Sequence, residues 1–335
     1  MKHLLDFVHT FYLARPPSSQ GGASLTLGCW VASFQDAGFP RRGIIHQPRA
    51  TPWVTVPGTS TRLMDMMTYA RGLLLFCAAA ILLGGCSAKM PQQSAQLDGE
   101  PLRQAEKRLR SFLNQSCVEA VDSDVQLSWK AYTQQETYPA ELQAQAPASL
   151  RLALTDPLGR PLLLLGSDGK TFTLADNRKV QGWRGNTDVP FIRRFLPAFI
   201  PMDDLFLWLS GRVRGERMQA AAARLDTEGT LWWHGGSAGS TTAHILALDE
   251  KNRLSRHLVV DSASNDILFE ARYSEYQATD KDCAWPGKIV LAGKAVEAEY
   301  TVAFSKIVSH TPVDRDRFEV TLPPHFTVKE LTDQD

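Results

Sequence analysis

A short apolar stretch that ends in a cysteine divides the chain more sharply than any other feature. Arg71 precedes the apolar run Gly72–Leu83, and Gly84 and Gly85 then lead into Cys86. The run is shorter than the roughly 20 apolar residues that a helix needs to cross a bilayer. A positive charge, an apolar block and small residues in this order are typical of a cleavable signal peptide. A buried core helix that stops at the two glycines is the alternative.

The end of this segment, Leu83-Gly-Gly-Cys86, resembles the bacterial lipobox. In that motif the cysteine thiol accepts a diacylglyceryl group after the signal is recognised. We therefore predict a signal peptide over 66–85, lipidation of Cys86 and a flexible tether over 86–100, which is rich in Ser, Gln and Pro. Ser87 follows the cysteine, whereas an aspartate there favours inner-membrane retention. The expected location is therefore the outer membrane, lipid-anchored and facing the periplasm.

Residues 1–65 precede this signal, although a signal peptide belongs at the N-terminus. They show no sustained periodicity and no candidate core. We interpret them as a non-native leader, with translation starting at Met64, Met66 or Met67. A genuine cytoplasmic extension is the alternative, and N-terminal sequencing of the precursor distinguishes the two.

Charge and cysteine content narrow the function classes. The 36 basic residues balance the 36 acidic ones, which argues against a nucleic-acid binder with a broad basic surface. After processing, Cys117 and Cys283 remain in an oxidising compartment, so a single disulfide is reasonable and two free buried thiols are the alternative. No metal-ligand spacing surrounds either cysteine or the histidines, and we expect neither a metal nor another cofactor.

The mature chain begins with helical periodicity and then changes to strand periodicity. Apolar residues recur at helical spacing from Pro101 to Leu113, which predicts an N-terminal helix. Many short alternating or apolar segments then predict an antiparallel meander, so that 101–335 is a mainly β domain. The expected strands lie near 125–131, 150–154, 162–165, 172–174, 229–234, 241–249, 253–260, 267–276, 287–292, 296–304 and 317–321. A polar turn is expected at Asp176-Asn177, followed by a strand through Val180.

One interruption of the strand pattern is strongly apolar. Pro201 favours a helix start, Asp203 and Asp204 suit the positive end of a helix rather than a carboxylate dyad, and Gly211 favours a stop. A second short helix is expected at 190–196. Because the first of these helices is apolar nearly all round, it is either a plug for the core of the sheet or a lid over a ligand.

A hairpin turn is predicted at Asp156-Pro157-Leu158-Gly159. Asp, Pro and Gly stand at the positions that a type I β-turn favours. Leu158 therefore lies at the tip, where it either folds back onto the protein or contacts a membrane or another protein.

These pieces together resemble the LolB family of outer-membrane lipoprotein receptors, within the LolA/LolB-like fold. The resemblance covers about 101–325 and is carried by Leu152-Ala-Leu-Thr-Asp-Pro-Leu-Gly159, by the helical segment Pro201–Leu209, by Trp285–Leu291 and by Phe318–Pro323. It implies an unclosed antiparallel β-barrel (half-barrel) with a helical lid, an N-terminal helix and an apolar cavity for acyl chains. It also implies that Pro157, Leu158 and Gly159 form a membrane-insertion loop in which Leu158 passes cargo to the membrane.

The predicted function is therefore to bind acyl chains or lipoproteins, received from a periplasmic LolA-like carrier, and to insert them into the inner leaflet of the outer membrane. The candidate cavity-lining residues are Leu127, Trp129, Leu152, Leu154, Phe172, Leu205 and Trp208. The alternative is a structural or envelope-assembly lipoprotein that uses the same sheet to bind a protein partner. An open apolar cavity favours the first function, and a filled interior favours the second.

One motif raises the possibility of an enzyme. Gly235-Gly-Ser-Ala-Gly239 matches the G-x-S-x-G nucleophile elbow, which has meaning only between a strand and a helix. Here both flanking segments, 231–234 and 241–249, have strand character. We therefore expect a hairpin loop at this position and no enzymatic activity.

Overall fold

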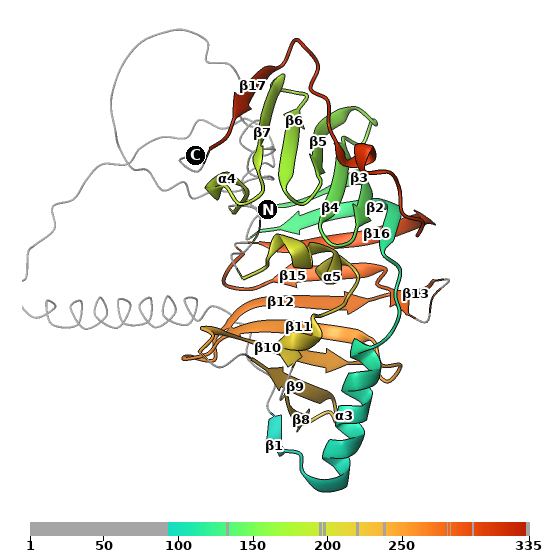
Figure 1. The fold of residues 1–335 in the computed structure, drawn as a ribbon, viewed down its shortest axis with the longest axis vertical. Helices are drawn as coiled ribbons and strands as arrows, with labels where there is room; N and C mark the ends of the chain where they lie inside the picture. The colour runs from blue at the N-terminus through green and yellow to red at the C-terminus, as the bar shows by residue number, and fades with distance from the viewer. Residues whose placement is uncertain are drawn as a thin grey trace, which may run out of the picture. The chain divides into compact units, whose positions relative to one another are not determined.

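One large, open sheet dominates the structure, a computed structural model (Figure 1). The structure describes residues 93–131, 134–193, 196, 199–218, 221–236, 239–279, 281, 283–296 and 298–332. Within these ranges, fifteen strands follow the order β1-β8-β9-β10-β11-β12-β15-β16-β2-β3-β4-β5-β6-β7-β17. The two end strands do not pair with each other, so the sheet is not closed into a barrel. The predicted mainly β, unclosed fold is confirmed.

The strands of this sheet are β1 Gln93–Gln96, β2 Ala120–Lys130, β3 Gln135–Gln145, β4 Ser149–Thr155, β5 Pro161–Ser167, β6 Thr171–Asp176, β7 Gln181–Asn186, β8 Ala222–Asp226, β9 Leu231–Gly235, β10 Thr242–Leu248, β11 Leu254–Asp261, β12 Ile267–Ser274, β15 Lys288–Ala292, β16 Glu299–Ser309 and β17 Thr327–Glu330. All neighbours pair antiparallel except β17 and β7. A separate hairpin joins β13 (Gln277–Ala278) to β14 (Ala284–Trp285).

The helices are α3 Gly99–Leu113, α4 Pro190–Arg193 and α5 Leu205–Leu209, with 3-10 turns η1 Met202–Asp204, η2 Gly215–Met218 and η3 Arg315–Phe318. Ala105, Leu109 and Phe112 form the buried stripe of α3 at helical spacing, which confirms the predicted N-terminal helix. Both lid helices also form at the predicted places, although α4 is shorter than expected. Among the described residues, no helix is long and apolar enough to cross a membrane.

The structure corrects several strand boundaries. The polar turn expected at Asp176-Asn177 follows β6 directly, but it extends over residues 177–180, so Val180 has a φ of 54° and lies in the turn rather than in the strand expected there. The strand expected at 317–321 is absent. The 3-10 turn η3 occupies its start, and the following residues cross the sheet without joining it. Strands β1, β3, β7, β8, β13, β14 and β17 were not anticipated.

Cys117 and Cys283 are joined by a disulfide, with their Cα atoms 5.3 Å apart. Cys117 lies between α3 and β2, and Cys283 directly precedes β14. The bond therefore ties the segment after the N-terminal helix to the β13–β14 hairpin, across 166 residues of sequence. The leader, the signal peptide, Cys86 and the first part of the tether lie outside the described residues.

The C-terminal segment after η3 crosses β5 and β7 at close range. A Cβ atom on Gly166 of β5 would lie 2.4 Å from the Phe318 carbonyl oxygen and 2.6 Å from the Val320 side chain. A Cβ atom on Gly182 of β7 would lie 2.5 Å from Leu322. Glycine at these two positions is what lets the segment pack directly on the strands.

Gly166→Ala is therefore expected to destabilise the protein by roughly 1–3 kcal/mol, because the new methyl group overlaps backbone atoms that must move. Gly215→Ala is the matched control, since nothing lies within 4 Å of that position. Urea denaturation of both variants measures the difference. Equal stabilities would show that the C-terminal segment is not packed as described.

Candidate functional site

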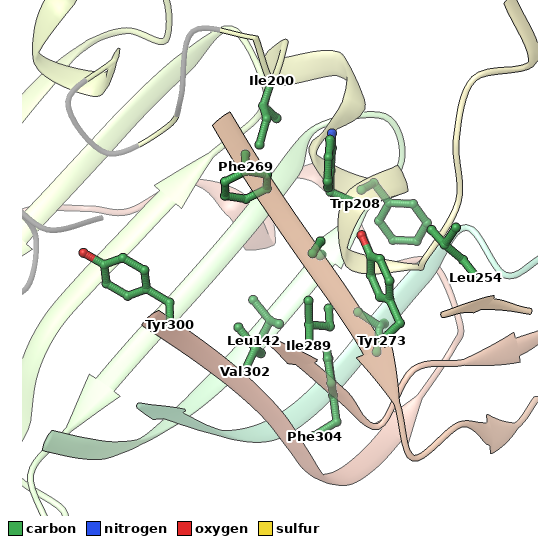
Figure 2. Close-up of a cluster of buried hydrophobic side chains, with 14 of the residues drawn as sticks. Leu142, Ile200, Trp208, Leu254, Phe269, Tyr273, Ile289, Tyr300, Val302 and Phe304 are labelled. Carbon is green, nitrogen blue, oxygen red and sulfur yellow. The ribbon is translucent and has the colours of Figure 1, made fainter. Parts of the chain in front are cut away.

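An apolar cavity lies between the inner face of the sheet and the lid segment, by which we mean Leu196, Ile200 and helix α5. Its volume is about 170 Å³. Every residue that lines it is aliphatic or aromatic. They are Leu127, Leu142, Leu150, Leu152, Leu196, Ile200, Leu205, Trp208, Leu209, Phe269, Ile289, Leu291, Val296, Tyr300 and Val302. In Figure 2, Ile200 and Trp208 of the lid segment face Phe269 of β12. Ile289, Val302 and Leu142 lie on β15, β16 and β3 of the same sheet.

The register of the sheet produces this lining. Ile289 of β15 stands opposite Val302 of β16, and Val302 in turn stands opposite Leu127 of β2. Leu142 of β3 stands opposite Leu152 of β4 in the same way. Because residues opposite each other in a sheet share a face, these pairs place one continuous apolar surface under the lid.

The seven predicted lining residues divide into two groups. Leu127, Leu152, Leu205 and Trp208 border the cavity. Trp129, Leu154 and Phe172 do not, which corrects the prediction for these three.

The reason for the correction is close packing. All three side chains face the same apolar core, but each is covered by neighbours. Leu154 is 1% exposed and stands between Ala140 and Leu163. Phe172 stacks against Phe191 of α4 with 6.1 Å between the ring centres.

Sequence reasoning missed most of the other lining residues. Leu142 lies on β3, a strand whose inward positions are mostly Tyr and Ala rather than large aliphatics. Phe269, Ile289, Tyr300 and Val302 lie on strands that were predicted, but their facing was not assigned. The alternation of Ala140, Leu142 and Ala144 with Glu141 and Gln143 was the signal that could have revealed β3.

The volume of the cavity is small for an acyl ligand. Pockets that hold drug-sized ligands measure about 300–1,000 Å³, against about 170 Å³ here. The lid supplies one wall through Leu205, Trp208 and Leu209 of α5, while Phe206 points away from it and packs on Trp285. A longer ligand therefore needs more space than the cavity offers in this arrangement of the lid and the sheet.

Charged side chains hold both ends of α5. Arg212, after the helix, donates to the Gln115 side chain and to the Phe112 carbonyl at the end of α3. Its guanidinium also lies 4.3 Å from the centre of the Phe112 ring, and burial lowers the pKa of Arg212 to about 10. This contact ties the end of the lid to the N-terminal helix.

At the start of α5, Asp204 is buried and forms ion pairs with Arg214 and Arg217. The sequence predicted a charge that stabilises the helix start. The carboxylate does lie there, but it makes no capping hydrogen bond and binds the two arginines instead. Breaking a buried pair of this kind leaves an uncompensated charge, which is strongly destabilising.

Two buried histidines extend this network into the sheet. Arg217 hydrogen-bonds to Nε2 of His244 on β10 at 2.9 Å, and Nδ1 of His244 lies 2.9 Å from Nε2 of His257 on β11. The His257 ring stacks on Trp208 with 4.0 Å between centres and 5° between planes. Burial lowers the pKa of His244 to about 4 and holds that of His257 well below its usual value.

The Leu158 hairpin has the predicted geometry. The Gly159 N–H donates to the Asp156 carbonyl, and the Asp156 carboxylate accepts from the backbone N–H groups of Leu158 and Arg160, each at 2.9 Å. The backbone hydrogen bond from Arg160 is the main reason that the pKa of Asp156 is lowered. Leu158 at the tip is 81% exposed, more than any other large hydrophobic residue in the described part of the chain.

The remaining motifs are placed as follows. The G-x-S-x-G segment connects β9 to β10, two antiparallel strands, and its Ser237 lies outside the described residues. His234 hydrogen-bonds to Gln93 of β1. Where the structure describes the chain, no group of His, Cys, Asp or Glu is arranged to hold a metal ion.

The chain matches no family model and no curated relative. Several solved structures are similar in arrangement, among them the following three. A domain from Vibrio parahaemolyticus described as an outer membrane lipoprotein-sorting protein has 12% identity and a TM-score of 0.39, over 65% of this chain and 94% of that one. A DUF1329 family protein from Desulfovibrio piger has 8% identity and a TM-score of 0.43, over 66% and 98%.

The third is a LolA superfamily protein from Nitrosomonas europaea, with 12% identity and a TM-score of 0.41, over 65% of this chain and 97% of that one. At these identities and TM-scores, the likeness carries no conclusion about what the chain binds.

The histidine pair predicts a specific loss of stability in mild acid. His244 stays neutral in the folded protein down to about pH 4, whereas an unfolded histidine takes up a proton near pH 6.5. The unfolded state therefore binds more protons between pH 6.5 and 4. The free energy of unfolding falls through this window by up to about 1.4 kcal/mol per pH unit for each such histidine.

Urea denaturation at pH 7, 6 and 5 measures this slope. His244→Gln is expected to reduce it, and His325→Gln, at an exposed position outside the network, is expected to leave it unchanged. Identical slopes in the wild type and His244→Gln would exclude a neutral buried His244.

Proposed function

We propose that this protein is a lipid-anchored carrier of acyl chains, which binds them between the lid and the sheet and delivers them to a membrane through the Leu158 hairpin. One observation carries the proposal: an all-apolar cavity under a short apolar lid, on a sheet that also exposes a single large leucine at a rigid hairpin tip. The predicted lipidation of Cys86 would hold the protein at the outer membrane. The lipid anchor would set where the protein lies and would take no part in binding the ligand.

The cavity supports a ligand that is apolar along its length. Its fifteen lining residues offer no charged group and no catalytic group. Burial of a CH₂ group is worth about 0.8 kcal/mol whether it enters a protein cavity or a bilayer. Transfer between such sites is therefore nearly balanced and needs no covalent chemistry. For the same reason we propose a binding protein and not an enzyme.

The Leu158 hairpin supports contact with a membrane. The Asp156 carboxylate fixes the turn from inside through two backbone hydrogen bonds and an ion pair with Arg160, so the leucine is presented on a rigid loop. Burying one leucine side chain gains about 1.5–3 kcal/mol. This is enough to favour brief insertion but not permanent binding.

The resemblance to LolB gives the finer form of the proposal. In that form the cargo is another lipoprotein, received from a LolA-like periplasmic carrier and inserted into the inner leaflet of the outer membrane. The alternative, an envelope-assembly lipoprotein that binds a protein partner, requires the cavity to remain filled and closed.

Leu158→Glu is expected to abolish delivery while leaving the fold intact, because the side chain makes its contribution outside the protein. Cells that depend on this variant should fail to place other lipoproteins in the outer membrane, as measured by membrane fractionation. The stability of the purified variant should stay within about 0.5 kcal/mol of the wild type.

The matched control is Val308→Glu, since Val308 is another exposed hydrophobic residue, 58% exposed on β16. It should sort lipoproteins normally. Normal sorting with Leu158→Glu, or equal defects in both variants, would contradict the proposal.

A further inference from the structure

A buried polar chain connects the lid to the sheet directly behind the cavity wall. It runs from Asp204 at the start of α5, through Arg217 and His244, to His257. His257 then stacks on Trp208, which is the lid residue that borders the cavity. The same indole also meets Phe269 edge-on, with 5.5 Å between centres. Trp208 is therefore held from two sides, by an apolar ring and by a polar network.

The hydrogen bonds assign a tautomer to each histidine. An arginine can only donate, so Nε2 of His244 is the acceptor of the bond from Arg217. Neutral His244 then carries its proton on Nδ1 and donates it to Nε2 of His257. His257 in turn must carry its proton on Nδ1, which has no hydrogen-bond partner among the described residues. Both hydrogen bonds that lead from Arg217 through His244 therefore donate in the same direction, towards His257.

We propose that His244 and His257 are positioning residues for the cavity wall: as a neutral, tautomerically ordered pair they hold Trp208 and α5 in the closed position, and a proton on the pair releases them. This inference rests on the proposed function for its meaning, because the wall matters only if the cavity takes a ligand.

The charges around the pair explain why a proton would break it. An added proton must bind Nε2 of His244 or of His257, and each of these atoms already accepts a hydrogen bond. On His244 it would place an N–H group against the guanidinium of Arg217. Arg212 and Arg214 line the small void beside His257 together with Arg217. The one carboxylate facing the void, Asp204, is already shared between Arg214 and Arg217.

The other groups described around the pair do not neutralise the positive charge that an added proton would bring. His257 is buried and bounded by Trp208 and His244, and the low pKa values of both rings agree with this environment. Glu216 acts on Arg214. A protonated pair therefore has to lose either its hydrogen bonds or its contact with Trp208.

The test follows Trp208 itself by ¹⁹F NMR of protein labelled with 5-fluorotryptophan. The Trp208 resonance is identified as the one missing from Trp208→Phe. In the wild type we expect it to stay constant from pH 7 to about pH 5 and to shift below that, with a midpoint near the pKa of His244, about 4.

Two variants of His244 separate positioning from general structure. His244→Gln can accept from Arg217 and donate to His257 but does not titrate itself, so its Trp208 resonance should match the wild type at pH 7. Any acid shift should occur at a lower pH than in the wild type, because only His257 can still take up a proton. His244→Leu breaks the chain, so its Trp208 resonance should already be displaced at pH 7. His325→Gln is the control and should behave as the wild type.

A Trp208 resonance that does not respond to acid, or that shifts equally in His244→Gln, would overturn the inference. If His244→Leu fails to fold, as judged by circular dichroism, the comparison of His244→Gln with the wild type still decides the question.

Binding of the neutral apolar dye N-phenyl-1-naphthylamine separates this inference from the proposed function. His244→Leu should bind the dye several-fold more tightly at pH 7, because a closed lid reduces apparent affinity by the fraction of open protein. Displacement of the Trp208 resonance without dye binding in any variant would support the positioning role and contradict the acyl-carrier function.

Discussion

The contact of Trp208 with the sheet is the interaction on which the rest of the structure depends. This one side chain borders the cavity, meets Phe269 of β12 and stacks on His257 of β11. The helix that carries it is only five residues long, too short to be stable alone. It exists because Phe206 and Trp208 are buried on the sheet and because Asp204 and Arg212 hold its two ends.

The apolar and polar parts of this arrangement do different work. The aliphatic rows of β2, β3, β4, β15 and β16 provide an apolar surface under the lid. The network of Asp204, Arg217 and the two histidines provides direction, since it has one satisfied arrangement and that arrangement is the closed one. A cavity that must both accept and release an apolar ligand needs such a balance. A cavity with apolar contacts alone would bind any apolar ligand, and a lid that could not open would not release it.

Much of the fold could be predicted from the sequence, because its signals were local. The α3 stripe, the Asp156–Gly159 turn and the apolar helix at 205–209 each depend on a few neighbouring residues, and the structure has all three. Leu127 and Leu152 were placed in the cavity correctly for the same reason, since alternation along one strand fixes a face. The cysteine count left two alternatives, a disulfide or two free thiols, and the structure has the disulfide.

The rest depended on contacts between distant segments. β3 was missed because small alanines hide its alternation, and β17 because its four residues are all exposed. Trp129, Leu154 and Phe172 face the core as predicted, but whether an inward residue borders a void depends on how its neighbours fill space. Nothing in the local sequence pairs His244 with His257, which are 13 residues apart. Only the register of β10 against β11 brings His244 and His257 together, and only the lid adds Arg217 and Trp208.

The central claim is that the cavity holds an acyl chain, and mass spectrometry of the protein isolated under non-denaturing conditions tests it most directly. The account predicts a co-purified acyl lipid or lipopeptide, close to one per protein, that is lost from a Leu152→Trp variant of unchanged fold, in which the larger ring fills the cavity. Absence of any acyl species from the wild type, or the same amount in both proteins, would contradict it.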